Sequence, residues 1–520
     1  MPRRALLAVL AVGLAAFATS LNGGFLADDF TYIGRFASFP ISEWPRLFVN
    51  EWSGGVWGFP LRELRPFAAL SYIVDSRVWG GNPVGYRLTN MALHLASTGL
   101  VAGLAWRYSG GRTWAALAAG LVFALHPAHV EAVTWITGRV DLIGTAAALA
   151  FIARSERDVE GGRRVWATGA LAALLVGIFS KEFCMFAPAI VLAKWAILDG
   201  GGKMPWLRRG VILAGSAAIF GLYAYCRIQA FGSEKAGFNA WADANSWHRH
   251  TSHLSWLVPV LPLKGIEEWT TPPVVARAQT VWMIGLGVGL VALFAARLAR
   301  RPQLAHGLFF VVIWYLLTVV PLMAVGYFTP RHLYFPSVGL AIALGLGCAA
   351  LPRGRALLLA ALLVPLALAH FKVLRPWSTS GTISRTALRE VHAALAGSHG
   401  SFVLMTSVPE RYQTALLWAW AMPAGATRPF IDLPPKARLI VRVGNYVRPD
   451  KWFEELQPAA ALKESSEGFA FHVDETGKIT SRKLAPAEMP KALESFETMA
   501  RALSPEAYSE WVRQLASGGK

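Results

Sequence analysis

The stretch ALLAVLAVGLAAFATSLNGGFLADDF, residues 5–30, joins an uncharged apolar segment to an acidic motif. Ala5–Leu21 has the length and composition of a membrane helix. Asp28 and Asp29 follow shortly after its end, and a carboxylate near hydrocarbon is costly unless it faces protein or water. A functional role is therefore expected for this pair, and an ordinary solvated turn with an acidic helix cap is the alternative. Arg3 and Arg4 would also suit a signal peptide, but many further apolar segments favour a retained helix.

The composition extends this interpretation to the whole chain. Of 520 residues, 54% are hydrophobic and only 16% are charged, whereas soluble domains average about 25% charged residues. We predict an all-α polytopic membrane protein, because the spans of a membrane β-barrel would be short and alternating. Eleven spans are expected, at residues 5–21, 86–106, 113–130, 135–153, 165–180, 183–198, 210–228, 278–296, 305–326, 333–351 and 354–371.

The net charge of +18 is explained by membrane topology better than by nucleic acid, which we do not expect as a partner. With the N-terminus inside, six short inner segments hold 16 Lys and Arg residues, whereas three short outer turns hold one each, namely Arg139, Lys181 and Arg331. This asymmetry predicts a cytoplasmic N-terminus and an extracytoplasmic C-terminal part. The Ala, Gly and Arg bias suggests a bacterial source, and hence the bacterial inner membrane.

The chain is expected to contain two domains. Residues 1–371 would form the membrane domain, with long outer loops at 22–85 and 229–277. Residues 372–520 contain no run long enough to span, and they are expected to form a small α+β domain outside the cytoplasm. Its predicted elements are strands at 401–408 and 437–443, a hairpin of 468–473 with 478–483, and helices at 486–501 and 505–516.

Two features of the membrane domain are expected to be irregular. The first outer loop carries Trp44, Trp52, Trp57 and Trp79, which suit the headgroup level, and Ser42–Phe48 suits a short interfacial helix.

The polar stretch HPAHVEAVTWITGRVD, residues 126–141, separates two apolar runs that are too short to cross the membrane alone. It must continue both helices inward or dip into the protein, where irregular backbone is tolerated if it lines a cavity.

Polar residues of both signs would meet at the outer face. They are Asp28, Asp29, Arg62, Arg65, His126, His129, Glu131, Arg139, Asp141, Lys181, Glu182, Arg331 and His332. Arg and Lys side chains bind phosphate groups, and a nearby Asp can act as a base toward a hydroxyl. This mixture favours a reaction on an anionic, membrane-borne substrate.

Structural roles are the alternative for several of these residues. Arg139 would pair with Asp141, and Lys181 with Glu182, or the cations would only cap helix ends. Adjacent carboxylates at Asp28 and Asp29 also leave open a divalent metal such as Mg²⁺ or Mn²⁺. A metal site at His126, His129 and Glu131 is less favoured, because Pro127 interrupts helical spacing.

Five ordered blocks resemble a known family. They are NGGFLADDFTYI, LRPFAALSYIVDSRVWGGNPVGYRLTNMALHL, FALHPAHVEAVTWITGRVDLIG, SKEFCMFAPAIVL and RHLYFPSVGLAIAL. Together they resemble the membrane part of TMTC-type protein O-mannosyltransferases and their bacterial relatives, which belong to the GT-C superfamily of polytopic glycosyltransferases. The resemblance covers roughly residues 1–350. In place of the tetratricopeptide repeats of the eukaryotic proteins, this chain has the predicted α+β domain, so the acceptor need not be a protein.

The resemblance implies transfer of a sugar from a polyprenyl-phosphate carrier, with inversion, to an acceptor at the outer face. The acidic motif then falls on Asp28 and Asp29, with Asp28 as the catalytic base. The donor phosphate would be bound by Arg331, Lys181, Arg139 and Arg65. Support would come from His126, His129, Glu131, Asp141, Glu182 and His332. The acceptor stays open between protein, lipid and glycan.

Two other functions compete with this interpretation. A transporter or flippase of lipid-linked sugars would use similar cations, although the chain halves show no evident inverted repeat. A scaffold that only presents the C-terminal part would leave the charges of the outer face without a role.

Overall fold

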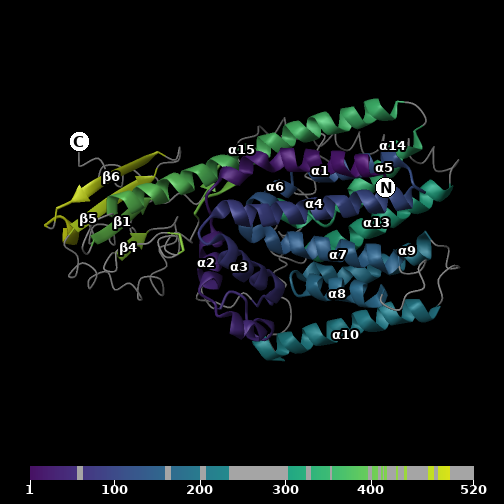
Figure 1. Cartoon of the computed structure of the whole chain (residues 1–520), viewed down its shortest axis with the longest axis horizontal. Coiled ribbons are helices and arrows are strands. Elements are labelled where there is room, and N and C mark those ends of the chain that lie inside the picture. The colour runs from purple at the N-terminus through teal and green to yellow at the C-terminus, as the bar shows by residue number, and fades with distance from the viewer. Residues whose placement is uncertain are drawn as a thin grey trace.

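The structure, a computed structural model, describes most of the membrane part and shorter stretches after it (Figure 1). The described residues are 1–54, 62–157, 166–198, 206–233, 302–323, 329–351, 354–395, 401–407, 411–413, 415–418, 429–430, 438–441, 467–473, 478–485 and 487–491. The predicted span 278–296, residues 234–277 of the second outer loop and the predicted helix 505–516 lie outside them. The count of eleven spans therefore stays a prediction.

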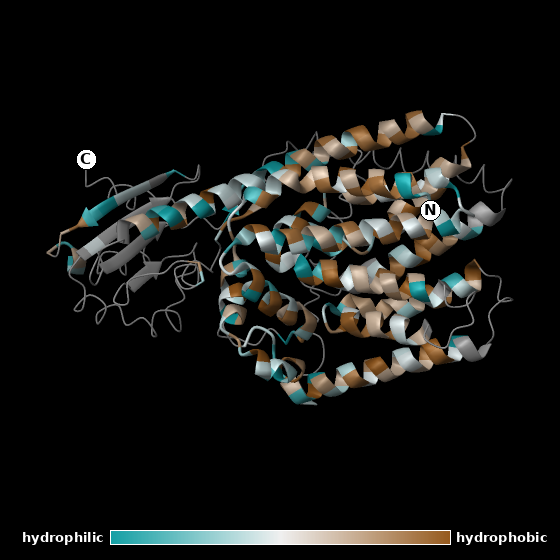
Figure 2. Cartoon of the chain, in the orientation of Figure 1, coloured by the Kyte–Doolittle hydropathy of each residue, from teal (hydrophilic) through white to brown (hydrophobic). Residues whose placement is uncertain are grey.

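Long apolar helices form a bundle, as the composition predicts (Figures 1 and 2). Its helices are α1 (Arg3–Phe17), α4 (Pro83–Tyr108), α5 (Thr113–Leu125), α7 (Arg139–Arg157), α8 (Trp166–Ile178), α9 (Ala187–Ile197), α10 (Trp206–Phe231), α13 (Pro302–Met323), α14 (Ser337–Ala350) and α15 (Arg355–Leu395). Within the described part, five segments are long and apolar enough to cross a membrane: Arg3–Asn22, Pro83–Tyr108, Ile136–Ser155, Arg209–Phe231 and Arg355–Ala393. The chain is a helical membrane protein.

Helix α5 contacts α1, α4, α14 and α15. The closest approach uses small residues: a Cβ atom at Gly345 of α14 would lie 2.6 Å from the Ala115 carbonyl oxygen of α5. In a bilayer, helix association depends on close van der Waals packing because lipid tails are as apolar as Leu. The glycine allows that approach.

The polar stretch between α5 and α7 dips into the protein, which confirms one of the two arrangements expected from the sequence. The helix ends at Leu125, and His126 is extended before Pro127. A short α6 (His129–Thr134) and the 3₁₀ turn η3 (Ile136–Gly138) follow, and every residue from 126 to 141 is buried. Irregular backbone is therefore covered by protein.

The first outer loop is more helical than its polar composition indicates. The 3₁₀ turn η1 (Ala18–Asn22) leads into this loop, which contains α2 (Asp28–Ala37), η2 (Ile41–Phe48) and α3 (Pro66–Trp79). Acidic residues in the first turn favour α2, and Pro66 favours the start of α3. The short helix predicted at 42–48 is confirmed as η2. Trp52 departs from the headgroup expectation, because it is buried and stacks on Tyr32 with ring centroids 4.0 Å apart.

Two shorter 3₁₀ turns connect the remaining helices at the same end, η4 (Glu182–Phe186) before α9 and η7 (Pro330–Leu333) before α14. Helix α15 continues past residue 371 as a single helix, so the predicted domain boundary falls inside it. Figure 2 shows that its first turns are mostly hydrophobic and that hydrophilic residues gather further along. The division into two domains stays a prediction.

The predicted strands are confirmed as β1 (Ser401–Ser407), β4 (Arg438–Val441), β5 (Glu467–Val473) and β6 (Ile479–Leu484). They form a sheet of order β4-β1-β5-β6, in which β1 is parallel to β4 and β5, and β5 pairs with β6 as the expected hairpin. A separate pair, β2 (Arg411–Tyr412) and β3 (Ala415–Leu416), contacts α15. Figure 1 shows that these strands lie beyond the end of the bundle that holds α2 and α3.

Candidate active site

The two adjacent aspartates occupy different environments. Asp28 begins α2 and is half-buried, whereas Asp29 is fully buried. The Leu26 N–H donates to Oδ2 of Asp29 over 2.9 Å. The Thr137 N–H and hydroxyl both donate to Oδ1 over 2.8 Å. Both oxygens of Asp29 thus accept hydrogen bonds. This residue joins η3 to the loop Gly23–Ala27, named here the acidic loop because Asp28 and Asp29 follow it.

Burial raises the pKa of Asp29 to about 6, against the opposing effects of its hydrogen bonds and of the Arg87 charge. The raised pKa reflects the cost of placing an ionised carboxylate away from water. Asp29 is therefore suited to anchoring the loop, and Asp28 is the more exposed member of the pair.

Arg87 of α4 supports the acidic loop, and it was not among the candidates selected from the sequence. It is 3% exposed, and its guanidinium donates to the carbonyl oxygens of Gly23 and Gly24, while its Nε donates to the Thr134 carbonyl over 3.3 Å. An arginine within a predicted apolar span is a functional candidate in itself. That signal was present, since span 86–106 contains Arg87.

Trp135 connects the acidic loop to a second group of charges. Its indole N–H donates to the Leu26 carbonyl over 3.2 Å. The Arg331 guanidinium lies 4.6 Å from the centroid of the same indole. Trp135 is therefore contacted at its edge by the acidic loop and on its face by Arg331.

Three cations on three segments form an ion cluster with buried carboxylates. Arg331 of η7 lies 3.3 Å from Glu131 and 3.5 Å from Asp141, measured from nitrogen to oxygen. The Lys181 Nζ lies 3.4 Å from the other oxygen of Asp141. The structure thus pairs Lys181 with Asp141, whereas the structural alternative paired it with its neighbour in sequence.

Arg65, which precedes α3, completes the cluster. Its Nη2 lies 3.4 Å from Glu182 and 2.8 Å from Glu63. The cation side chains in this cluster are only 10–12% exposed. Burial lowers the pKa of Lys181 and raises that of Glu131, in each case against oppositely charged neighbours. The cluster, named here the cation cluster, consists of Arg65, Lys181, Arg331, Glu131, Asp141 and Glu182.

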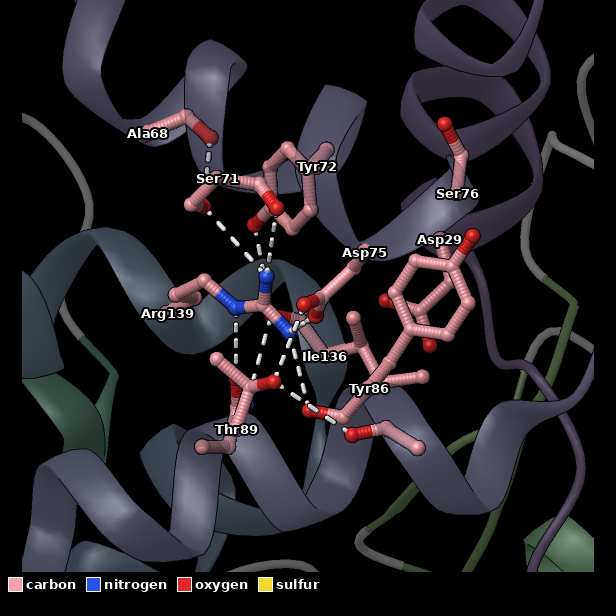
Figure 3. A network of polar contacts seen from close by, with 12 residues as sticks. Asp29, Ala68, Ser71, Tyr72, Asp75, Ser76, Tyr86, Thr89, Ile136 and Arg139 are labelled. Carbon is pink, nitrogen blue, oxygen red and sulfur yellow. Dashed lines mark hydrogen bonds and ion pairs between the residues drawn. The ribbon is translucent and has the colours of Figure 1, made fainter. Parts of the chain in front are cut away.

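Arg139 lies in a separate polar network with Asp75, Tyr72 and Tyr86 (Figure 3). It is fully buried, its Nη2 lies 2.6 Å from Asp75 of α3, and its Nε donates to the Asn90 side chain over 2.7 Å. A further N–H donates to the Tyr86 carbonyl, and the guanidinium lies 4.8 Å from the Tyr72 ring centroid. Its predicted pairing with Asp141 is wrong, and these contacts indicate a structural role instead of donor binding.

The predicted histidines have mainly structural contacts. The Nδ1 of His129 lies 2.8 Å from the Phe123 carbonyl, so in the neutral ring this nitrogen carries the proton. Its Nε2 then accepts from the Ser337 hydroxyl at 2.8 Å. His126 accepts from the Ala128 N–H at 3.3 Å, and His332 accepts from the Thr329 N–H as part of a capping box. These residues shape the backbone that carries Glu131 and Arg331.

A metal shared by both aspartates does not fit this geometry, because Asp29 already accepts three hydrogen bonds. Across the part of the chain that the structure describes, no group of three His, Cys, Asp or Glu residues is placed to hold a metal ion. Both nitrogens of His129 are also engaged, which disfavours the metal site considered at His126 and Glu131.

The helical bundle is similar in fold to the polytopic membrane enzymes of the GT-C type. The chain is similar in structure to ArnT from Cupriavidus metallidurans bound to undecaprenyl phosphate, with a TM-score of 0.52 and 14% identity over 96% of this chain and 95% of that one. The apo form of ArnT gives a TM-score of 0.53 at 12% identity, over 92% and 98% of the two chains. At this identity the likeness shows the fold alone.

Sequence comparison gives more specific relatives, although no family model matches the chain. Protein O-mannosyl-transferase Tmtc2 of Drosophila melanogaster is 31% identical over 241 residues, which are 43% of this chain and 25% of that protein. Human TMTC4, also a protein O-mannosyl-transferase, is 27% identical over 68% of this chain and 56% of its own length. The resemblance predicted from the five sequence blocks is confirmed. The chain spans between a quarter and about half of the length of these two relatives.

Proposed function

We propose that this protein is a membrane glycosyltransferase that moves a sugar from a polyprenyl-phosphate carrier to a hydroxyl group at the outer face of the membrane. The observation that carries the proposal is the placement of Trp135 between two candidate functional groups. Its edge contacts the loop of Asp28, and its face contacts Arg331 of the cation cluster. An acid–base group and a phosphate-binding group are thereby held at one end of the bundle.

Asp28 acts as the general base in this proposal. The acceptor oxygen attacks the anomeric carbon while its proton passes to the Asp28 carboxylate, and the bond from that carbon to the phosphate oxygen breaks. A single displacement of this kind inverts the anomeric configuration. Asp28 is suited to the role because it is more exposed than Asp29, which is fully buried.

Arg331, Lys181 and Arg65 stabilise the negative charge that develops on the leaving phosphate. Groups that are already oriented toward a developing charge need no reorganisation during the reaction. The ion pairs with Glu131, Asp141 and Glu182 supply that orientation, because they hold the cations of three separate segments together. Arg139 is left out of this role because its contacts are those of a buried structural network.

The names of the relatives support the donor and the reaction class. The TMTC proteins are named as O-mannosyl-transferases, and ArnT binds undecaprenyl phosphate in its crystal structure. A bacterial inner membrane with a cytoplasmic N-terminus and a periplasmic C-terminal part completes the proposal.

Purified protein in nanodiscs, supplied with a radiolabelled polyprenyl-phosphate sugar and a hydroxyl acceptor mixture, tests the proposal. We expect a labelled glycosidic product, which a chelator would reduce only if a metal takes part. Asp28→Asn keeps the shape of the side chain and removes its basicity, so turnover should fall by about 10²–10⁴. Donor binding should persist, because the base acts on the acceptor.

The matched control is Glu488→Gln, which alters an exposed pair with Arg482 in the C-terminal part. Its turnover should equal that of the wild type. Wild-type turnover in folded, donor-binding Asp28→Asn protein would remove Asp28 from the mechanism. Movement of the lipid-linked sugar across the membrane without any glycosidic product would instead establish the transporter.

A further inference from the structure

The backbone of the acidic loop, Gly23–Ala27, is held by four separate parts of the chain. The Gly24 N–H donates to the Gly381 carbonyl of α15 over 2.7 Å, and the Ser384 hydroxyl donates to the Phe25 carbonyl over 2.7 Å. Arg87 of α4 and Trp135 hold other carbonyls of the loop. The fourth partner comes from beyond the last membrane helix: the Ala27 N–H donates to the Leu417 carbonyl over 2.8 Å.

Ala27 has an unusual backbone conformation. Its φ of 43° and ψ of −125° lie in a region that L-amino acids rarely occupy. Such a conformation is strained and persists only where surrounding contacts impose it. Because Ala27 directly precedes Asp28, the direction in which α2 starts depends on these contacts. The hydrogen bond to Leu417 is therefore placed where it bears on the proposed base.

Trp418 is connected to the acidic loop through a second path, a relay in which Ser384 links the indole of Trp418 to the Phe25 carbonyl. The indole is fully buried, and its N–H donates to the Ser384 hydroxyl over 2.8 Å, while that hydroxyl donates to the Phe25 carbonyl. A serine hydroxyl can accept and donate at once, so both bonds can exist together. Phe430 adds edge-to-face contacts to Phe25 and Phe30, with ring centroids 4.8 and 5.0 Å apart.

The close approach of α15 leaves the acidic loop little room to move. A Cβ atom at Gly24 would lie 2.9 Å from the Gly381 carbonyl oxygen, and one at Gly381 would lie 2.7 Å from the Gly23 Cα. Backbone therefore contacts backbone at this point. Ser384 lies on α15, the helix that makes this close contact. A hydrogen bond from Trp418 to Ser384 therefore acts on a loop that is already packed against α15.

We propose that Trp418 is a positioning residue for Asp28, acting through Ser384 and Phe25, and that the segment Leu417–Trp418 completes the active site from outside the membrane bundle. This inference rests on the proposed function of Asp28. In this proposal the region after α15 is part of the active site, because it holds the acidic loop in the conformation that presents Asp28.

Trp418→Phe tests the relay, because it keeps an aromatic ring and removes the only N–H of the side chain. Ser384→Ala is the second variant, and it removes one hydroxyl from α15 with little change of volume. We expect faster amide hydrogen exchange across residues 22–30 in both variants, since exchange reports local opening. Turnover should fall about tenfold, the worth of one such hydrogen bond in the reactive state, while the donor KM stays unchanged.

The double variant provides a stringent control. If Trp418 acts through Ser384, the two substitutions together should lower turnover no further than Ser384→Ala alone. Glu488→Gln, an exposed change in the same C-terminal part, should alter neither exchange nor turnover. Additive losses in the double variant would overturn the relay.

Unchanged exchange at residues 22–30 in both single variants would also overturn the proposal, as would unchanged turnover in an active background. Failure of the proposed function would look different. The wild type would then form no glycosidic product, whereas hydrogen exchange would still show whether Trp418 holds the acidic loop.

Discussion

At the residue scale, side chains of the same type have different partners. Asp28 and Asp29 are adjacent in sequence, yet Asp29 is the one whose two oxygens accept from Leu26 and Thr137. Arg139 and Arg331 were both selected as donor-binding candidates, yet one lies in a closed network with Asp75 and the other in the cation cluster. Residue type therefore selects candidates, and the local partners assign the role.

The raised pKa of Asp29 has a consequence for stability. Its pKa is about 6 in the folded protein against an ordinary value of 3.8. Above the ordinary value the unfolded chain loses its proton first, so this group lowers stability as the pH rises from about 4 to 6, and the loss then stays constant. At neutral pH the free energy of unfolding is thereby lower by at most about 3 kcal/mol.

Asp29→Asn should remove this pH dependence. We expect the difference in melting temperature between pH 4.5 and pH 7.5 to be smaller in Asp29→Asn than in the wild type, because Asn does not titrate. Thermal unfolding in detergent at both pH values measures it. The absolute stability should fall, since an Asn side chain cannot accept from both Leu26 and Thr137 in the same way. An identical pH difference in both proteins would show that Asp29 does not titrate in this range.

A second prediction distinguishes the cations that bind the donor phosphate from an arginine that stabilises the fold. Lys181→Ala and Arg331→Ala should each weaken donor affinity, because one charge-assisted contact is worth about 1.5–3 kcal/mol, or roughly tenfold to more than a hundredfold. Arg139→Ala should instead destabilise the fold by about 3–5 kcal/mol, since it leaves Asp75 buried without its partner.

Donor affinity can be measured with a fluorescent polyprenyl phosphate, and stability by thermal unfolding. Arg139→Lys retains a charge and should give enough folded protein for the binding measurement, with a donor affinity close to the wild type. A large loss of donor affinity in Arg139→Lys would contradict a purely structural role for Arg139. Unchanged donor affinity in Lys181→Ala and Arg331→Ala would contradict their role in donor binding.

At the element scale, the site depends on helices that are interrupted or continued in unexpected places. α5 stops at Leu125, and the buried stretch through Asp141 brings Glu131, Trp135 and Thr137 toward the acidic loop. α15 continues past residue 371 and presents Gly381 and Ser384 to the same loop. The elements that shape the site are therefore those that depart from a simple membrane span.

The contact between α5 and α14 supports this arrangement and can be tested with a matched pair of glycines. Gly345→Ala should destabilise the protein by roughly 1–3 kcal/mol, because the new methyl group would overlap the Ala115 carbonyl. Gly347→Ala, on the same helix, meets open space and should be neutral or stabilising by up to about 1 kcal/mol. Thermal unfolding of both variants gives the comparison. Equal effects would show that helix propensity, and not close packing, determines stability here.

At the scale of the whole molecule, the two ends of the bundle differ in charge chemistry. Arg107 donates to the Ala153 carbonyl in the last turns of α7, and Arg112 donates to the Ala349 carbonyl at the end of α14. Arg355 lies 5.0 Å from the Trp114 ring centroid at the start of α5. These arginines gather at one end, and the acidic loop, Trp135 and the cation cluster lie at the other. From the positive-inside rule we therefore propose that the candidate active site lies outside the cytoplasm.

Reporter fusions test this orientation. Fusions at residues 110, 160, 205 and 300 should report the cytoplasm, and fusions at 240 and 450 should report the outer side, because cations concentrate in the inner segments. Alkaline phosphatase and green fluorescent protein reporters give opposite signals on the two sides. A fusion at residue 160 that reports the outer side would invert every motif-bearing segment and so contradict the orientation.

The sequence alone determined the class of the protein, most helix positions and a set of candidate site residues. Apolar length and the distribution of Lys and Arg reflect partitioning between lipid and water, which acts on each segment locally. For that reason the helices could be predicted, and the inward dip of residues 126–141 was one of the two arrangements that the short apolar runs allow. Residue pattern and turn signals also predicted four strands and the hairpin of 468–473 with 478–483, but not the pairing of β1 with β4 and β5. The sequence further indicated Asp28, Lys181 and Arg331 as candidate site residues.

Only the tertiary structure decided which residues act together. Asp29 meets Thr137 across 108 positions of sequence, Arg139 meets Asp75 instead of Asp141, and Ala27 meets Leu417 from beyond the last membrane helix. Such pairs depend on how complete helices pack, and no local pattern of hydrophobicity or charge encodes them. The difference between a candidate base and an anchoring aspartate is a difference in burial and partners, and these exist only once the chain has folded.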